Sequence, residues 1–323
     1  MKVMRVIGNI EMYVGKIEQI TESVKRFYLY PSDQKLLPAF TGGAHITTYV
    51  DLGDNILERD YSLVSHPTDR THYAISINRD PHSRGGSAYW HDHIKVGDKV
   101  ISSFPKNHFT LGFHAKHHVF YAAGIGITPF LTMMEELEAQ GKTFELHYAA
   151  RTKEACAYHD YLNEKYPGKC TFYFSRSDEP QRMTPETMKN QRIGSHVYFC
   201  GPVAMVSEYK EAALSYGYPE KSIHFELFAA ASGENNPFLV EVINHNKVIE
   251  VNPEQTLLEA LLDAGIEAPY SCKAGGCGQC EVDVVEGEVD HRDIFFSDEE
   301  REQKKMILTC CSRAKEEKLV LKL

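Results

Sequence analysis

The chain lacks the features that mark exported and membrane-spanning proteins. It has no run of eighteen or more apolar residues, and charged residues are scattered through its first twenty positions. A secretory signal starts with basic residues and continues with an apolar stretch, and a spanning helix needs about twenty apolar residues. We therefore expect no export and no membrane span, and we place the chain in the cytoplasm.

The chain also has fewer basic than acidic residues. The 35 lysine and arginine residues face 45 aspartate and glutamate residues, which leaves a formal net charge of −10. Binding to the phosphates of nucleic acid needs clustered basic side chains, so this balance argues against a nucleic acid partner. An acidic surface suits a partner protein with a basic docking face.

Low-complexity tracts are missing too, and a chain of 323 residues exceeds what one hydrophobic core supports, so we expect several folded domains. Short alternating apolar and polar runs predict an antiparallel β-barrel over 1–111. Apolar runs that alternate with helical segments predict a doubly wound α/β domain over 112–229. A polar linker at 230–237 then leads to a small α+β, β-grasp-like domain at 238–323, which begins with a strand over 238–251.

Five of the eight cysteines crowd into the last fifth of the chain. In a cytoplasmic protein such crowding indicates metal binding or redox chemistry. Cys272, Cys277 and Cys280 are spaced C-x4-C-x2-C, and Cys310 follows after 29 intervening residues. This is the spacing of a plant-type [2Fe–2S] site. Glycines between the cysteines leave the backbone free to turn its N–H groups toward the cluster sulfurs.

A structural zinc site is the alternative for these cysteines. Zinc ligand pairs are normally two to four residues apart in both halves of a site. Here the second half would be the direct neighbours Cys310 and Cys311, so the spacing favours the iron–sulfur cluster. These two cysteines compete for the fourth ligand position. Alternation along a strand would turn their side chains to opposite faces.

Two segments of the first domain place an arginine close to a serine. Arg59, Tyr61 and Ser62 form an R-x-Y-S run, which is similar to the run that lines the flavin in ferredoxin reductase-like families. There the arginine can pair with phosphate and the serine can bond near flavin N5. An exposed strand face without a ligand is the alternative.

The second segment precedes a predicted helix, where backbone N–H groups and an arginine can bind a terminal phosphate. Its residues are Arg84, Gly85, Gly86 and Ser87. We expect this segment and Arg59 to hold one phosphate together.

The second domain carries two nucleotide segments, GIGITP and CGP, each at the end of a predicted strand. Small residues there let a helix N-terminus approach a pyrophosphate. The expected binding residues are Gly124, Gly126, Thr128, Pro129, Cys200, Gly201 and Pro202. Farther along, Phe228 follows the last strand of the domain, where an aromatic ring can cover a flavin face.

In order, the runs GAHI, RDYSL, SRGGS, NHF, GIGITP and CGP and the cluster loop resemble the phthalate dioxygenase reductase and vanillate demethylase reductase family, which also includes carnitine monooxygenase reductases. The resemblance covers essentially the whole chain. It implies FMN rather than FAD, NADH as electron donor and a Rieske-type oxygenase as partner. It also implies that Cys310 is the fourth cluster ligand, because the C-terminal part resembles a plant-type ferredoxin. A reductase for a cytochrome P450 or a diiron hydroxylase, or a non-catalytic redox sensor, is the alternative.

A nicotinamide gives two electrons as hydride and the cluster accepts one, so a flavin between them is the needed converter. We expect the chain to orient these groups rather than to supply acid–base chemistry. Ser62, Cys200 and Glu226 are the expected catalytic positions, with Thr128 beside them.

The chain departs from the family's pattern at the residues that would select between NADH and NADPH. NADH-selective proteins often carry an acidic residue near the end of the second parallel strand to bond the ribose hydroxyl. Here Arg151–Lys153 and Ser175–Arg176 follow the second and third strands, and basic residues could accommodate a 2′-phosphate. Because Asp178 and Glu179 follow shortly, we expect NADH, with NADPH as the alternative.

Overall fold

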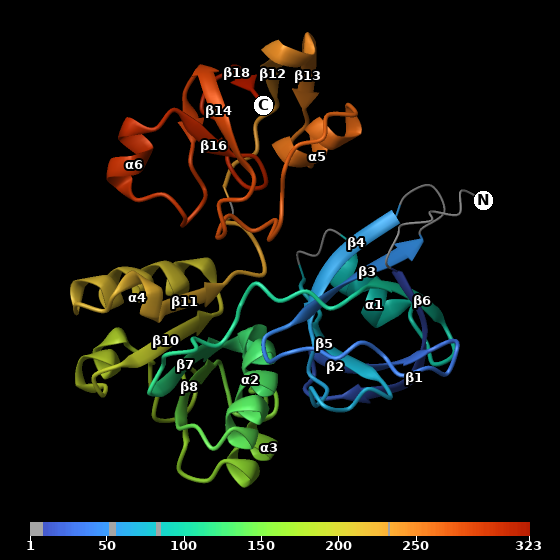
Figure 1. The fold of residues 1–323 in the computed structure, drawn as a ribbon, viewed down its shortest axis with the longest axis vertical. Coiled ribbons are helices and arrows are strands. Elements are labelled where there is room, and N and C mark those ends of the chain that lie inside the picture. Colours follow the sequence, from blue (N-terminus) through green and yellow to red (C-terminus); the bar gives the residue numbers. More distant parts are fainter. Residues whose placement is uncertain (1–8, 52–55, 82–84, 232) are drawn as a thin grey trace. The chain divides into compact units, whose positions relative to one another are not determined.

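The computed structural model describes residues 9–51, 56–81, 85–231 and 233–323. Three sheets of five or six strands organise the described residues, and a fourth has two strands (Figure 1). They fall into two compact units, of which the first holds the barrel and most of the parallel sheet. The second unit holds Pro202–Glu211 and Phe225–Leu323. This arrangement confirms the predicted multidomain fold.

Antiparallel strands form the predicted barrel, in the order β4-β3-β6-β1-β2-β5. They are β1 (Asn9–Gln19), β2 (Val24–Pro31), β3 (His45–Asp51), β4 (Ile56–Ser62), β5 (Tyr73–Asn78) and β6 (Lys99–Ser103). Leu63, just past β4, bridges to Ile75 and so closes the sheet. Helix α1 (Gly86–Asp92) places the fully buried Trp90 edge-on against Phe27.

The predicted α/β domain is a sheet of order β11-β10-β7-β8-β9, in which β10, β7, β8 and β9 run parallel. Its elements are β7 (His117–Ala123), η1 (Gly124–Ile127), α2 (Thr128–Ala139), β8 (Phe144–Ala150), α3 (His159–Lys165), β9 (Cys170–Phe174), η2 (Pro185–Asn190), β10 (Ser195–Cys200), α4 (Val203–Ser215), η3 (Glu220–Ser222) and β11 (Ile223–Glu226). Because the strands are parallel, their carboxyl ends share one edge, where ligands of such sheets bind.

The C-terminal domain is a mixed sheet of order β13-β12-β18-β14-β16, in which β12 and β18 are parallel. Its elements are β12 (Phe238–Val242), η4 (Ile243–His245), β13 (Lys247–Val251), α5 (Leu257–Asp263), β14 (Glu281–Glu286), β15 (Val289–Asp290), α6 (Asp298–Gln303), β16 (Met306–Leu308), β17 (Arg313–Ala314) and β18 (Lys318–Lys322). Thr256 and Glu259 form a capping box that starts α5, whose leucines join the core of this sheet.

The prediction of one strand over 238–251 is wrong, because this segment is the hairpin β12–β13. Asn246 turns the chain with a φ of 50°, a left-handed conformation that asparagine tolerates better than most residues. In the described part of the chain, no helix is long and apolar enough to cross a membrane.

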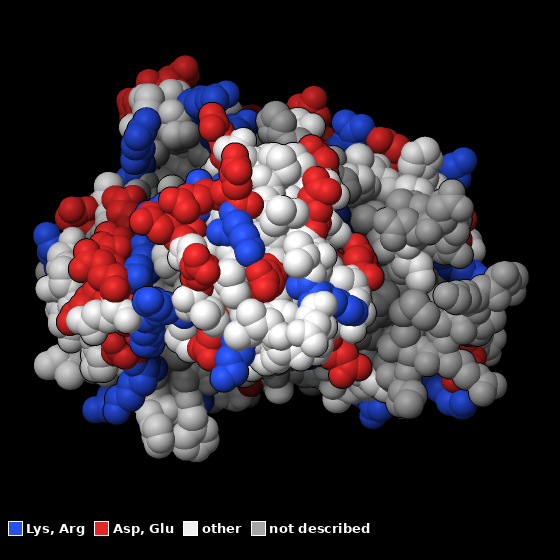
Figure 2. Space-filling view, turned by 90° about the horizontal axis from the view of Figure 1, so that it is seen from above, with Lys and Arg blue, Asp and Glu red and all other residues white. Residues whose placement is uncertain are grey.

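Negative charge is concentrated in the C-terminal domain. From Phe238 onward the sequence carries 18 acidic and 10 basic residues, which accounts for −8 of the net charge of −10. Figure 2 shows one face of the molecule, on which acidic side chains gather with basic ones between them.

Candidate functional site

The four cysteines predicted to bind the cluster come from two segments. Cys272, Cys277 and Cys280 lie in the loop between α5 and β14, and Cys310 lies in the turn after β16. Their thiols hydrogen-bond in pairs, Cys272 with both Cys277 and Cys310, and Cys280 with Cys310. The fold therefore brings the four predicted ligands together.

These contacts divide the four thiols by their pKa. Side-chain contacts with Cys277 and Cys310 lower the pKa of Cys272 and contact with Cys310 lowers that of Cys280, whereas the same contacts raise the pKa of Cys277 and of Cys310. Iron binds the deprotonated sulfur. In the described residues, no three His, Cys, Asp or Glu side chains are arranged to hold one metal ion. A [2Fe–2S] cluster divides its four thiolates between two irons, so pairs of thiols fit it.

Glycines let the cluster loop pack tightly. Gly275 and Gly278 have φ angles of +79° and +76°, which other residues rarely adopt. A Cβ on Gly275 would lie 2.8 Å from the sulfur of Cys311, and one on Gly278 would lie 2.4 Å from the ring of Phe295. Side chains at these positions would push the loop away from its supports.

The expectation that Cys310 and Cys311 alternate along a strand is wrong. Strand β16 ends at Leu308, and both cysteines lie in the turn that follows. Both are buried, at 3% and 7% exposure. The sulfur of Cys311 lies 3.8 Å from the Leu308 carbonyl oxygen and 3.6 Å from the Ser312 hydroxyl. The turn therefore packs Cys311 against its own backbone.

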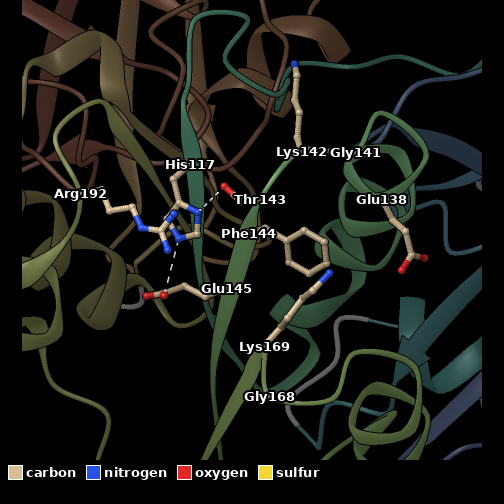
Figure 3. Close-up of a pocket in the computed structure, with 10 residues that line it drawn as sticks. All are labelled: His117, Glu138, Gly141, Lys142, Thr143, Phe144, Glu145, Gly168, Lys169 and Arg192. Atoms are coloured by element: carbon tan, nitrogen blue, oxygen red, sulfur yellow. Dashed lines mark hydrogen bonds and ion pairs between the residues drawn. The ribbon is translucent and has the colours of Figure 1, made fainter.

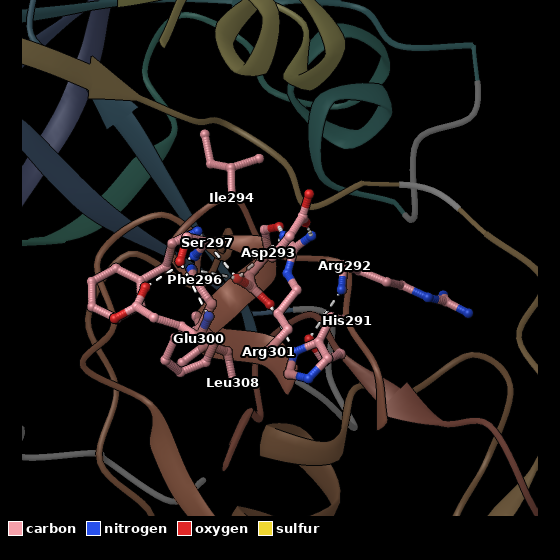
Figure 4. A network of polar contacts seen from close by, with 12 residues as sticks. His291, Arg292, Asp293, Ile294, Phe296, Ser297, Glu300, Arg301 and Leu308 are labelled. Carbon is pink, nitrogen blue, oxygen red and sulfur yellow. Dashed lines mark hydrogen bonds and ion pairs between the residues drawn. The ribbon is translucent and has the colours of Figure 1, made fainter. Parts of the chain in front are cut away.

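A buried carboxylate that the sequence analysis missed supports the cluster loop. Asp293 accepts hydrogen bonds from the backbone N–H groups of Phe295 and Phe296, at 3.1 and 2.9 Å. Figure 4 shows His291 and Arg301 pointing toward it, at 3.3 and 3.8 Å. Although burial opposes the charge, the His291 and Phe296 hydrogen bonds lower the pKa of Asp293.

This network touches the loop directly. The Ile294 N–H donates to the Gly275 carbonyl oxygen at 3.1 Å. An Asp whose side chain caps the N–H groups two and three residues ahead is a known turn signal, so the run DIFF could have indicated the turn but not its place beside the cluster.

Strand β4 carries the predicted flavin residues. Arg59 and Tyr61 lie on it, and burial raises the pKa of the Tyr61 hydroxyl above its usual value. The hydroxyl of Ser62, at the end of the strand, is buried and has no hydrogen-bond partner among the described residues. A buried hydroxyl without a partner is costly, so the position fits a polar atom of a bound group.

The predicted phosphate segment lies against β4. Gly85 precedes α1 with a φ of +91° and faces open space, and a Cβ on Gly86 would lie 2.8 Å from the Arg59 Nε atom. The structure thus brings Arg59 and Gly86 together. Ser87 accepts a hydrogen bond from the Asp80 N–H at 3.1 Å. Arg84 lies outside the described residues.

The two nucleotide segments meet at the carboxyl edge of the parallel sheet. A Cβ on Gly126 would lie 2.1 Å from the carbonyl oxygen of Cys200 and 2.9 Å from the nitrogen of Gly201. Only glycine allows this approach. Tyr148, which the sequence analysis missed, donates a hydrogen bond to the Gly124 carbonyl oxygen at 2.9 Å and holds the loop from the neighbouring strand.

The other residues predicted to bind the nucleotide or the flavin come just after Gly126 or after Cys200 in the chain. Thr128 and Pro129 are buried at the start of α2, and the Thr128 hydroxyl bonds the Ile125 carbonyl oxygen at 3.0 Å. Pro202 is exposed just before α4. In the second unit, Glu226 is half-buried at the end of β11, and the Phe228 ring beyond it is 45% exposed.

A hollow of about 460 Å³ opens at the other edge of the parallel sheet. Figure 3 shows His117 at the start of β7, bonded to Thr143 and paired with Glu145, with Arg192 beside them. This edge holds the amino ends of the strands, so the hollow is separate from the predicted nucleotide residues.

Comparison with known proteins matches two parts of the chain to domain families. Residues 240–315 match the 2Fe-2S iron-sulfur cluster binding domain, and residues 120–211 match the oxidoreductase NAD-binding domain. These matches support a [2Fe–2S] cluster in the C-terminal domain and a nicotinamide nucleotide in the α/β domain. Together with the similarity to phthalate dioxygenase reductase and to a carnitine monooxygenase reductase subunit, they support the expected set of FMN, [2Fe–2S] cluster and NADH.

Several proteins resemble the chain over its whole length. It is 38% identical to the carnitine monooxygenase reductase subunit of Escherichia coli (strain K12), over 97% of this chain and 98% of that one. It is 35% identical to the vanillate O-demethylase oxidoreductase of Acinetobacter baylyi, over 98% and 99% of the two chains. Among solved structures, phthalate dioxygenase reductase aligns with a TM-score of 0.82 at 33% identity, over 98% of both chains.

A longer protein is similar as well. An intact type IV self-sufficient cytochrome P450 monooxygenase aligns with a TM-score of 0.71 at 35% identity, but this chain covers 41% of it. With full-length relatives above 30% identity, the chain belongs to the family of NAD(P)H-dependent oxygenase reductases that includes the carnitine monooxygenase reductase subunit, vanillate O-demethylase oxidoreductase and phthalate dioxygenase reductase.

Proposed function

We propose that the chain passes electrons from NADH to a Rieske-type oxygenase. The observation that carries this proposal is the alignment with phthalate dioxygenase reductase over 98% of both chains. The converging cysteines and the close contact of Gly126 with Cys200 fit the cluster and the nucleotide that such a reductase needs. We include the cytoplasm in the proposal, since cluster thiols must stay reduced and none of the eight cysteines, all of which lie in the described residues, forms a disulfide.

When bound, FMN converts the two-electron chemistry of the nicotinamide into the single electrons that the cluster takes. The chain itself binds and orients. We assign the phosphate of FMN to Arg59 and to the segment Arg84 to Ser87, because the Arg59 side chain lies against Gly86. The unpartnered hydroxyl of Ser62 would bond the flavin ring, and Tyr61 would lie along it.

The carboxyl edge of the parallel sheet would hold the nucleotide. Gly124 and Gly126 would let its pyrophosphate approach the start of α2. Cys200 ends β10 at this edge, and we assign it to positioning the nicotinamide. We keep Glu226 as a predicted positioning residue and Phe228 as a predicted cover of the flavin face.

A second acceptor has specific support. The likeness to a self-sufficient cytochrome P450, at 35% identity over 98% of this chain, shows the same reductase architecture joined to a haem domain. A P450 or another haem oxygenase is therefore the competing acceptor. A redox sensor without turnover would need the cluster cysteines but would not need nucleotide-binding residues at the carboxyl edge of the parallel sheet.

Anaerobic electron transfer tests the proposal. NADH should reduce the purified chain, as followed by visible absorption and electron paramagnetic resonance, and the reduced chain should then reduce a phthalate dioxygenase-type Rieske oxygenase in stopped flow. A P450 haem domain is the matched acceptor. Faster reduction of the haem domain would overturn the Rieske assignment, and no reduction by NADH would overturn the reductase function altogether.

A further inference from the structure

Two arginines stand where the sheet would receive the adenosine ribose of a nucleotide. Ala123, next to the pyrophosphate loop, pairs with Ala149 of β8, so the end of β8 lies one strand away from that loop. In such sheets an acidic residue here bonds the ribose 2′-hydroxyl, whereas an arginine accommodates a 2′-phosphate. This chain has Arg151 directly after β8.

The neighbouring strand brings a second arginine to the same place. Ser175 donates its N–H to the Ala150 carbonyl oxygen at 3.2 Å, and Arg176 donates its N–H to the Arg151 carbonyl oxygen at 2.8 Å. Strand pairing thus continues past the ends of β8 and β9 and places the two arginine backbones side by side. Guanidinium groups bind phosphate oxygens with paired N–H bonds.

Both arginines are available. Each is exposed, and neither has an ion-pair or side-chain hydrogen-bond partner among the described residues. Lys153, the other cation of this segment, differs because it lies 3.9 Å from the Asp160 carboxylate.

The acidic residues that follow lie away from the strand ends. The Ser177 hydroxyl donates hydrogen bonds to the carbonyl oxygens of Phe174 and Glu179, at 3.2 and 2.7 Å, and the Gln181 N–H returns to Phe174 at 2.9 Å. These bonds close a turn around Asp178 and Glu179. Both acidic residues therefore belong to a turn after β9 and not to the end of β8, where an NADH-selective acid would stand.

We propose that Arg151 and Arg176 form a subsite for the 2′-phosphate of NADPH, so that the chain accepts NADPH as well as NADH. The inference rests on the proposed function, because it concerns the nucleotide that supplies the electrons. The two arginines are specificity residues and take no part in the redox step.

Binding of nucleotide fragments tests the subsite without any electron transfer. Calorimetry on the intact holoprotein should find 2′,5′-ADP bound at least tenfold more tightly than 5′-AMP, because a charged hydrogen bond to the extra phosphate contributes about 1.5–3 kcal/mol. Arg151→Gln and Arg176→Gln should each remove most of this difference. Arg192→Gln is the matched control, since Arg192 is equally exposed but lies at the other edge of the sheet.

Turnover with ferricyanide supplies the second readout. Both arginine variants should lower kcat/KM for NADPH about tenfold or more and leave kcat/KM for NADH within about twofold. Equal binding of 2′,5′-ADP and 5′-AMP to the wild-type chain would overturn the subsite, as would an equal loss in Arg192→Gln. Failure of NADH itself to support turnover would count against the reductase function, while fragment binding would still decide the subsite.

Discussion

The cluster loop of the second unit and the carboxyl edge of the parallel sheet in the first unit differ in the chemical groups that they offer. We call the second region the coenzyme edge. The cluster loop offers side chains, and three of its four thiols lie within the short run from Cys272 to Cys280. The coenzyme edge offers mostly bare backbone, at Gly124 and Gly126, and its parts come from strands far apart in the chain. Side-chain ligands show in a sequence as spacing, whereas a backbone cradle shows only once the strands are paired.

Their supports differ as well. The cluster loop rests on buried charge, the carboxylate of Asp293. The coenzyme edge rests on atoms in direct contact, since no space remains between Gly126 and Cys200. Substitutions in the first region should therefore act through charge and ligation, and those in the second through sterics.

Loss of a ligand gives the largest effect in the second unit. Cys277→Ser should abolish the cluster absorption and the reduction of cytochrome c or an oxygenase, because one iron loses a thiolate. NADH-dependent reduction of ferricyanide should persist, since that dye draws electrons from flavin. Parallel loss of both activities would show that the cluster also holds the first unit together, and the two regions would no longer be separable.

Gly126→Ala should give the corresponding effect in the first unit. The new Cβ would meet the Cys200 carbonyl oxygen at 2.1 Å, so one of the two segments must move. A displacement of about 1 Å at a reacting group can cost about a hundredfold in rate, and we expect that loss in NADH-dependent flavin reduction by stopped flow. The cluster spectrum, read in the same sample, should not change. A nearly wild-type rate would place the nucleotide elsewhere.

Asp293→Asn tests the buried charge and should have a moderate effect. Removing a charged acceptor from two N–H groups, His291 and Arg301 should lower the free energy of unfolding of the cluster domain by about 2 kcal/mol. Loss of the cluster absorption in urea measures this change. Asp298→Asn is the control, because Asp298 contacts the same Arg301 at 3.1 Å but its side chain is 97% exposed, and such pairs contribute little.

The same network predicts a pH dependence. The folded-state pKa of Asp293 is lowered, so its carboxylate stabilises the fold above the unfolded value of about 3.9, and this contribution is lost as the pH falls from that value through the lower folded-state pKa. The difference in stability between wild type and Asp293→Asn should therefore stay at its full size from neutral pH down to about pH 5 and shrink below about pH 4. A difference that stays constant with pH would assign the effect to packing.

The sequence predicted features that depend on local spacing and missed those that depend on contacts between distant segments. The domain order, the sheet types and the four converging cysteines could be predicted, because periodicity and ligand spacing are local. The contact between Arg59 and Gly86 could be proposed only because both segments look like phosphate binders. Asp293 and Tyr148 were missed, because their roles depend on loops that meet only after folding.

The hairpin β12–β13 was missed for another reason. Apolar residues continue on both sides of its turn, and the polar run Asn244–Lys247 looked like part of one long alternating strand. Alternation cannot distinguish a strand from two strands joined by a short turn when the turn residues are themselves in phase. Asn246, in its left-handed conformation, was the available signal.

Cys311→Ser should have the smallest effect, although Cys311 is next to a ligand. Its sulfur packs near the Leu308 carbonyl oxygen, at 3.8 Å, and a serine hydroxyl can donate to the same oxygen. The cluster spectrum and potential should therefore stay close to wild type, whereas Cys310→Ser should bleach the absorption or shift the potential strongly. Strand alternation cannot distinguish the two cysteines, since both lie in a turn, and the thiol contacts favour Cys310 instead: Cys272 and Cys280 both contact Cys310, which Cys311 also contacts. A bleached Cys311→Ser variant beside an intact Cys310→Ser variant would reverse the ligand assignment and would mean that the turn closes one residue later than the structure has it.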